Sequence, residues 1–272
     1  MLLARFRLGP GALRMMLALV VLVSHLSALN IGRPAVVLFF LLSGYWVSRR
    51  WHSGNQSVTG FALARLLRIW PLFAIVAVAT WLALGQLGLP RAADLPAGLL
   101  LLGSASRNDL LLQVDWSLDL ELQFYLALPL MWLAVARLSL PQLWLLAAAG
   151  WAVGIVLMAR GAYSFLLYLP AFAAGMWLTR VRWQSGAGPV LIGLALFVAI
   201  GAGLAAWPES RPLVFKQPGL SPLVEHLGHL AWSLPLWPLV AWSLSVTGSA
   251  RANRRDKAWG DAAYSLYLVH AP

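Results

Sequence analysis

The sequence contains no cysteine, and acidic residues are scarce, with 9 Asp and Glu against 20 Lys and Arg in 272 residues. The absence of cysteine excludes disulfide bonds, thiolate nucleophiles and cysteine-ligated metals. Internal repeats of the solenoid kind and low-complexity segments are also absent. Neither a disulfide-stabilised scaffold nor a repeat protein is therefore possible.

Charged residues make up only 11% of the chain, whereas hydrophobic residues make up 61%. One soluble core cannot bury so many apolar side chains, and several apolar runs approach or exceed the ~18 residues that cross a bilayer. The 15 tryptophans suit the aromatic belts at membrane interfaces. We therefore predict an all-α fold, a polytopic transmembrane bundle of about 9–10 helices. It is expected to form a single membrane domain over residues 1–272.

The apolar runs also locate the expected helices. The predicted spans are residues 12–29, 34–48, 65–88, 96–104, 117–136, 141–159, 162–179, 188–207 and 229–247, followed by a last helix from about residue 260. At about 1.5 Å per residue, that last helix is too short to cross a bilayer. We therefore expect it to be incomplete and the C-terminus to be truncated.

The net charge of +11 does not indicate nucleic-acid binding, because the arginines cluster at the ends of the expected spans. Positive-inside topology, anionic lipid or a polyanionic ligand explains this placement better. The distribution of Lys and Arg places the N-terminus, Arg49–Arg50 and the pair Arg65 and Arg68 in the cytoplasm. It also favours a re-entrant segment at 96–115 over one that crosses.

The first candidate site lies in the span 12–29. If these residues are helical, Arg14 and His25 share one face, with a rise of roughly 16 Å between them. This geometry places Arg14 at the membrane edge and His25 near mid-membrane. An ionisable group at that depth is costly unless it faces protein or a water-filled cavity. The depth favours a functional His25 over a structural one.

The second candidate site is the sequence RLLRIWP at 65–71. Residues three apart lie on one helix face, so Arg65 and Arg68 can present two guanidinium groups to a single anion. The structural alternative is that both side chains extend to lipid headgroups, as arginines at helix ends often do. Pro71, which bends the helix and frees a backbone carbonyl, favours the anion site.

The third candidate site is the sequence WSLDLELQFYLALP at 116–129. Asp119 and Glu121 differ in direction by about 200°, so only one of them can face a given cavity. Glu121 shares its face with Ser117 and Tyr125 and is the better candidate, whereas Asp119 is expected near the helix entrance, where negative charge suits the helix dipole. The Glu121 carboxylate could orient the imidazole of His25, or it could be the structural partner of an arginine.

A metal site is not predicted. Glu225, His226 and His229 have a spacing that suits metal ligands on a helix, but the HExxH pattern and a clear further ligand are missing. We likewise expect no permanently bound cofactor.

Five motifs occur in order along the chain: a helix with Arg14 and His25, then FFLLSG, RLLRIWP, WSLDLELQFYLALP and YSLYLVHAP. In this order and spacing the chain resembles the acyltransferase-3 family of integral membrane O-acyltransferases, from about residue 11 to its end. Leu17 stands where the family usually has alanine. Members also usually run longer, with ten complete helices and both ends in the cytoplasm, which differs from the charge distribution here.

The resemblance implies transfer of an acyl group, expected to be acetyl, from cytoplasmic acyl-CoA to a hydroxyl of a cell-envelope glycan, a lipid-linked sugar or a similar acceptor. It implies a multi-pass protein of the inner (plasma) membrane, with the lipid bilayer as a partner and no role for nucleic acid. The family's first-helix arginine and histidine fall on Arg14 and His25, its paired arginines on Arg65 and Arg68, and its glutamate on Glu121. For this reaction we expect His25 to act as general base with Glu121 as its support, and Arg65 and Arg68 to bind the CoA phosphates, with Arg14 as a third contact.

Direct transfer is favoured over a covalent acyl-enzyme, because cysteine is absent and no serine has an evident base beside it. An acyl-histidine intermediate stays open. The rival class is a proton-coupled secondary transporter or flippase that uses His25, Glu121 and the arginines as a proton and anion path. The sequence shows no inverted repeat of hydropathy in its favour, and dependence on acyl-CoA distinguishes the two classes.

Overall fold

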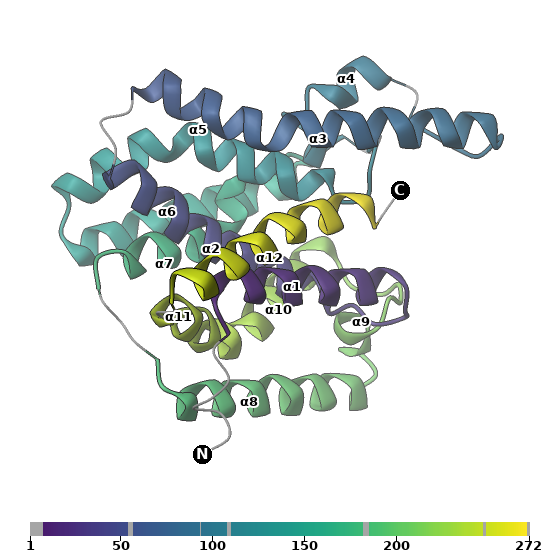
Figure 1. Cartoon of the computed structure of the whole chain (residues 1–272). Coiled ribbons are helices and arrows are strands. Elements are labelled where there is room, and N and C mark those ends of the chain that lie inside the picture. Colours follow the sequence, from purple (N-terminus) through teal and green to yellow (C-terminus); the bar gives the residue numbers. More distant parts are fainter. Residues whose placement is uncertain are drawn as a thin grey trace. The chain divides into compact units, whose positions relative to one another are not determined.

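The computed structural model describes residues 8–53, 57–92, 94–107, 110–181, 185–246 and 249–270. These residues are mainly helical and contain no β-strand, which confirms the predicted all-α class (Figure 1). The chain forms two compact units, Met1–Leu42 with Arg180–Tyr267 and Ser43–Thr179 with Leu268–Pro272. We call them the first and the second unit.

The first unit combines the two ends of the sequence. Its helices are α1 (Pro10–His25), the first part of α2 (Gly32–Ser53), α8 (Ala187–Ala206), α9 (Arg211–Val214), α10 (Pro222–Ser233), the 3-10 helix η4 (Leu234–Leu236), α11 (Trp237–Ser245) and most of α12 (Ala250–Val269). α8 packs against α9, α10, η4 and α11, and α1 packs against α11. Its core contains the fully buried side chains of Leu13 and Leu38.

The second unit is the middle of the sequence. It contains the rest of α2, α3 (Val58–Gln86), α4 (Leu95–Leu99), the 3-10 helix η2 (Ser104–Ser106), α5 (Asp115–Arg137), α6 (Leu140–Ala159), the 3-10 helix η3 (Phe165–Tyr168) and α7 (Leu169–Leu178). α5 packs against α3, η2 and η3, and α6 packs against η3 and α7. The buried rings of Phe124 on α5 and Phe172 on α7 stack with centroids 4.0 Å apart.

Gly44 lets α2 approach α7 within the second unit. A β-carbon added at Gly44 would lie only 2.2 Å from the carbonyl oxygen of Phe172. No other residue type fits this contact without moving a helix backbone. Small residues at such positions are typical of helix packing in membranes.

Three of the described helices, α3, α6 and α8, are long and apolar enough to cross a membrane. Most of their side chains are exposed, and the exposed ones include large apolar residues such as Ile75, Leu145 and Val198. Apolar surface of this extent is unfavourable in water but is suited to contact with lipid. The exposed faces are therefore consistent with a membrane protein.

The segment predicted as a span at 96–104 does not form a helix of membrane length. α4 contains 5 residues, which correspond to a rise of about 7.5 Å. Leu101 then adopts a positive φ of 61°, and the irregular backbone that follows donates to Asp119 of α5 through the N–H groups of Gly103 and Ala105. Irregular backbone at membrane depth needs such partners from protein. α4 is therefore too short to cross a membrane, and the re-entry of this segment stays a prediction.

Several further helices differ from their predicted bounds: α3 begins at Val58 rather than at residue 65, and the expected span 162–179 forms η3 followed by α7. The expected span 229–247 is split into α10, η4 and α11, because Pro235 and Pro238 each lack the N–H that a continuous helix needs. The last helix begins at Ala250 rather than near residue 260 and has 20 residues, but it is not among the described helices that are apolar enough to cross a membrane. Alanine, arginine and lysine extend this helix beyond the apolar stretch because they are strong helix formers.

Candidate functional site

His25 is the last residue of α1, and its side chain is half-buried. The helix was expected to continue to residue 29, but Leu26 is already its C-terminal cap. The hydroxyl of Ser24 donates to the carbonyl of Leu29 at 2.8 Å, which holds a tight turn in place of a further helical turn. His25 therefore lies where regular helix gives way to irregular backbone, and not inside a helix as predicted. Arg14 is eleven residues earlier on the same helix face, as predicted.

The turn after His25 is held by the segment between α9 and α10. The backbone N–H of Asn30 donates to the carbonyl of Val214 at 2.7 Å, and the N–H of Lys216 donates to the carbonyl of Ala28 at 2.8 Å. Lys216 also donates through its ammonium group to the carbonyl of Ser24. Residue 216 thus contacts the residue directly before His25.

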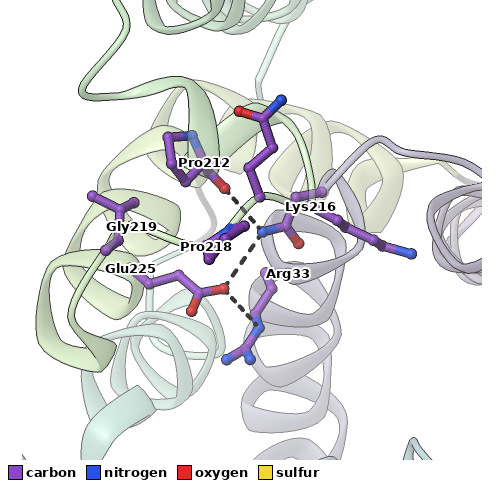
Figure 2. Close-up of a pocket in the computed structure, with 9 residues that line it drawn as sticks. Arg33, Pro212, Lys216, Pro218, Gly219 and Glu225 are labelled. Carbon is purple, nitrogen blue, oxygen red and sulfur yellow. Dashed lines mark hydrogen bonds and ion pairs between the residues drawn. The ribbon is translucent and has the colours of Figure 1, made fainter.

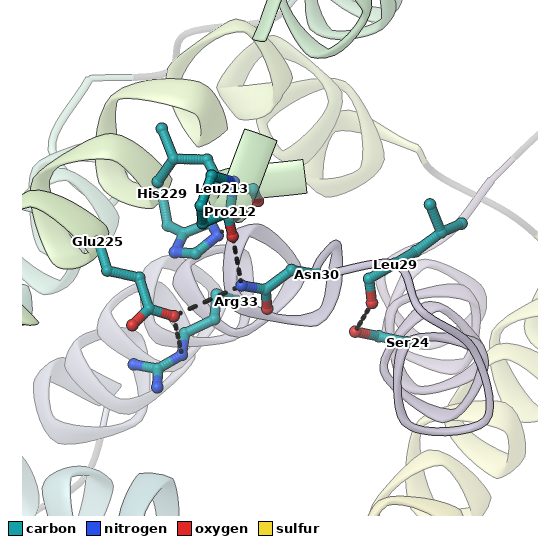
Figure 3. Close-up of polar contacts among 8 residues, drawn as sticks. All are labelled: Ser24, Leu29, Asn30, Arg33, Pro212, Leu213, Glu225 and His229. Atoms are coloured by element: carbon teal, nitrogen blue, oxygen red, sulfur yellow. Dashed lines mark hydrogen bonds and ion pairs between the residues drawn. The ribbon is translucent and has the colours of Figure 1, made fainter. Parts of the chain in front are cut away.

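Side chains connect the same two segments. Figure 3 shows the Asn30 amide directed at the carbonyl of Pro212 and the carboxylate of Glu225, both at 3.4 Å. Glu225 also pairs with Arg33, with 3.8 Å between Oε1 and Nε. The imidazole of His229 contacts the carbonyl of Leu213 at 2.9 Å. These contacts fix the position of the turn relative to α10.

These residues border a cavity of about 290 Å³ in the first unit (Figure 2). The residues that line it are Asn30, Arg33, Pro212, Lys216, Gln217, Pro218, Gly219, Leu220 and Glu225. Sequence reasoning missed this cavity, because its residues come from two segments almost two hundred positions apart. The only sequence signal is the proline-rich, polar character of residues 208–222.

Glu121 lies in the second unit at the centre of a small polar cluster. Its Oε1 accepts hydrogen bonds from the hydroxyls of Ser43 on α2 and Tyr125 on α5, and these two hydroxyls lie 3.5 Å apart. Ser43 and Tyr125 are buried. A carboxylate oxygen that accepts two O–H groups is held in one position by them. Tyr125 lies on the same helix face as Glu121, as predicted from its position four residues later.

Arg65 is buried in the second unit, with 7% of its surface exposed, and its guanidinium lies over the ring of Phe61 at 5.7 Å. Its charge interacts favourably with Glu121 and unfavourably with Arg50 and Arg68. Its Nε is buried without a hydrogen-bond partner among the described residues. Arg68, in contrast, is exposed. The pair is thus one buried and one exposed guanidinium on neighbouring turns of α3.

Asp119 and Asp115 have structural partners. Asp119 is fully buried and accepts from the N–H groups of Gly103 and Ala105 and from the side chain of Gln123. Asp115 is the first residue of α5 and accepts from the N–H groups before it. Both carboxylates anchor the irregular segment onto α5, close to the helix entrance where they were expected.

The predicted site residues are distributed over both units. Arg14 and His25 belong to the first unit, and Arg65, Arg68 and Glu121 belong to the second. Contact between His25 and Glu121 therefore stays a prediction. Within the part of the chain that the structure describes, no group of three or more His, Asp or Glu side chains could hold a metal ion.

A family model described as an acyltransferase domain matches residues 7–272, essentially the whole chain. The matched range includes all five predicted site residues. No curated protein and no solved structure matches the chain.

Proposed function

Since the chain belongs to the acyltransferase-3 family and is an acyltransferase, we propose that its donor is acyl-CoA, expected to be acetyl-CoA, and that its acceptor is a hydroxyl of a cell-envelope glycan or lipid-linked sugar. The observation that carries the proposal is the family match over residues 7–272. The apolar helices agree with a reaction at the membrane. We propose the inner membrane as its location.

The reaction needs a base for the acceptor hydroxyl. In the proposed step the imidazole of His25 takes the hydroxyl proton as the hydroxyl oxygen attacks the thioester carbonyl carbon. The ester C–O bond forms, the C–S bond breaks, and the proton passes from the imidazolium to the CoA thiolate. General base catalysis of this kind typically contributes about 10²–10⁴-fold. The position of His25 at a helix end beside a polar turn supports access by a hydroxyl substrate.

The donor carries several phosphate charges and needs cationic partners. We assign Arg65 and Arg68 to the CoA phosphates, with Arg14 as a third contact. The buried Nε of Arg65, which has no hydrogen-bond partner among the described residues, supports this assignment, because a buried donor of this kind is costly unless an acceptor pairs with it. Arg50, whose charge acts on Arg65, adds to the local positive potential.

Glu121 is assigned a supporting role. It would orient His25 or stabilise the imidazolium that forms during transfer. The two hydroxyl donors from Ser43 and Tyr125, which hold the carboxylate in one position, support this role. The alternative that the sequence left open, a structural partner for an arginine, is consistent with the electrostatic interaction between Glu121 and Arg65. The Glu121 carboxylate can support His25 and also interact with Arg65, so the two roles are compatible.

The test uses the purified full chain in lipid nanodiscs, with acetyl-CoA binding and slow thioester hydrolysis measured separately. His25→Ala is expected to lose hydrolysis and keep binding, whereas Arg65→Ala and Arg68→Ala are expected to weaken binding. Arg160→Ala, at an exposed arginine after α6, is the matched control. Wild-type protein that does not bind acetyl-CoA would overturn the proposal. Equal affinity in the two arginine variants would refute their assignment alone.

A further inference from the structure

The cavity beside the turn 26–31 has a size that suits one sugar ring but is too small for the proposed donor, acyl-CoA. Ligand pockets for drug-sized molecules generally start at about 300 Å³, and this cavity measures about 290 Å³. Coenzyme A, with a nucleotide, a diphosphate and a pantetheine arm, is larger than a typical drug. A single sugar unit of an acceptor is a much better match.

The polar groups around the cavity are of both hydrogen-bonding types. Glu225 supplies a carboxylate, Arg33 and Lys216 supply cationic donors, and Asn30 and Gln217 supply amides that donate and accept. A sugar ring carries hydroxyls that also donate and accept, so mixed groups of this kind suit it. An acyl chain could form no hydrogen bonds with these polar groups and would displace water from them, which is unfavourable. Pro212 and Pro218 add the apolar surface against which the C–H face of a sugar can pack.

The cavity lies next to the helix end that carries His25. Lys216, one of the lining residues, donates to the carbonyl of Ser24, the residue directly before His25. Asn30, another lining residue, is five positions after His25 on the same turn. Both segments belong to the first unit, and backbone hydrogen bonds hold them together. A ring bound here would place its hydroxyls near the C-terminal end of α1.

We propose that the cavity formed by Asn30, Arg33, Lys216, Gln217 and Glu225 binds one sugar ring of the acceptor and presents its hydroxyl to His25. This inference rests on the proposed function for the role of His25, but the binding of a sugar ring can be tested without any turnover.

The experiment measures binding of four methyl glycosides, those of glucose, galactose, rhamnose and N-acetylglucosamine, to the full chain in nanodiscs by saturation-transfer NMR. At least one glycoside is expected to bind wild-type protein. Glu225→Gln, which keeps the shape but removes the charge, is expected to weaken that binding by about tenfold. Glu209→Gln changes an exposed glutamate in the same link between α8 and α10 and is expected to have no effect.

Acetyl-CoA binding, measured on the same samples, shows that each variant is folded and separates the two proposals. If acetyl-CoA binds but none of the glycosides does, or if Glu225→Gln binds them as wild type does, the cavity assignment is wrong and the proposed function stands. If a glycoside binds in the expected pattern and acetyl-CoA does not bind, the proposed donor is wrong and the sugar site stands. Should Glu225→Gln not fold, Gln217→Ala provides the second test, since it removes an exposed lining side chain and is also expected to weaken binding.

Discussion

The start of α1, the helix that carries Arg14 and His25, depends on an acid far away in the sequence. The helix begins with Gly9 as its N-terminal cap and Pro10 at its first position, and Gly9 has no side chain to accept from the free N–H groups. The carboxylate of Asp256 on α12 accepts instead from the N–H groups of Gly11 and Ala12, each at 2.9 Å. Gly11 permits this approach, because a β-carbon there would lie 1.7 Å from the carbonyl oxygen of Asp256.

Asp256→Ala should therefore destabilise the protein. Loss of an acidic helix cap costs about 1–2 kcal/mol, and loss of the charge at the positive end of the helix dipole adds about 0.5 kcal/mol. A total near 2 kcal/mol corresponds to a fall in the unfolding temperature of about 4–8 °C for a chain of this size. Asp256→Asn keeps an oxygen that can accept one of the two N–H groups, so about half of the loss is expected.

Thermal unfolding in detergent, followed by circular dichroism, measures the difference. Asp261→Ala is the matched control, because Asp261 lies on the same helix and is exposed. A surface change of that kind should stay within about 0.5 kcal/mol of wild type. If Asp256→Ala and Asp261→Ala unfold at the same temperature, the cap does not contribute to stability and the reasoning fails.

Three further outcomes are expected from the second unit. Gly44→Ala should lower the unfolding temperature by several degrees through the clash with Phe172, and an unchanged temperature would contradict the close contact. Tyr125→Phe should cost about 1 kcal/mol, and a cycle with Glu121→Gln should be less than additive if the two share the hydrogen bond seen here. Asp115→Ala should cost about 1–3 kcal/mol, because the buried N–H groups of Leu111 and Leu112 lose their acceptor, and an unchanged unfolding temperature would exclude this role of Asp115.

The helical class and the approximate place of most helices could be predicted from the sequence. Apolar runs such as those of α6 and α8 are long and uninterrupted, so their helices were placed almost to the residue. Predicted helix bounds were wrong where a segment forms a helix without being apolar. This is the case at α12, whose first half is charged but strongly helix-forming. The bounds were also wrong at α1, which ends at His25 because a turn stabilised from a distant segment competes with the helix.

Local spacing predicted that Asp119 and Glu121 point in different directions, and their hydrogen-bond partners differ accordingly, while a functional role for Glu121 stays a prediction. It could not find Ser43 as a donor to Glu121, since that contact joins α2 to α5. Similarly, the spacing of Arg65 and Arg68 predicts two guanidinium groups on neighbouring turns, but burial of Arg65 and exposure of Arg68 depend on what packs around α3.

By itself, the sequence determined the composition of a membrane protein, the absence of cysteine chemistry, and the ordered motifs that identify the family. These properties follow from residue type and local period, which need no knowledge of distant contacts. Only the tertiary structure decided that Asp256 caps α1 and that the segment between α9 and α10 forms hydrogen bonds with the turn after His25. It also decided that a polar cavity lies beside this turn. Each of these depends on residues far apart in the chain, and side-chain pattern carries no information about which distant segments will meet.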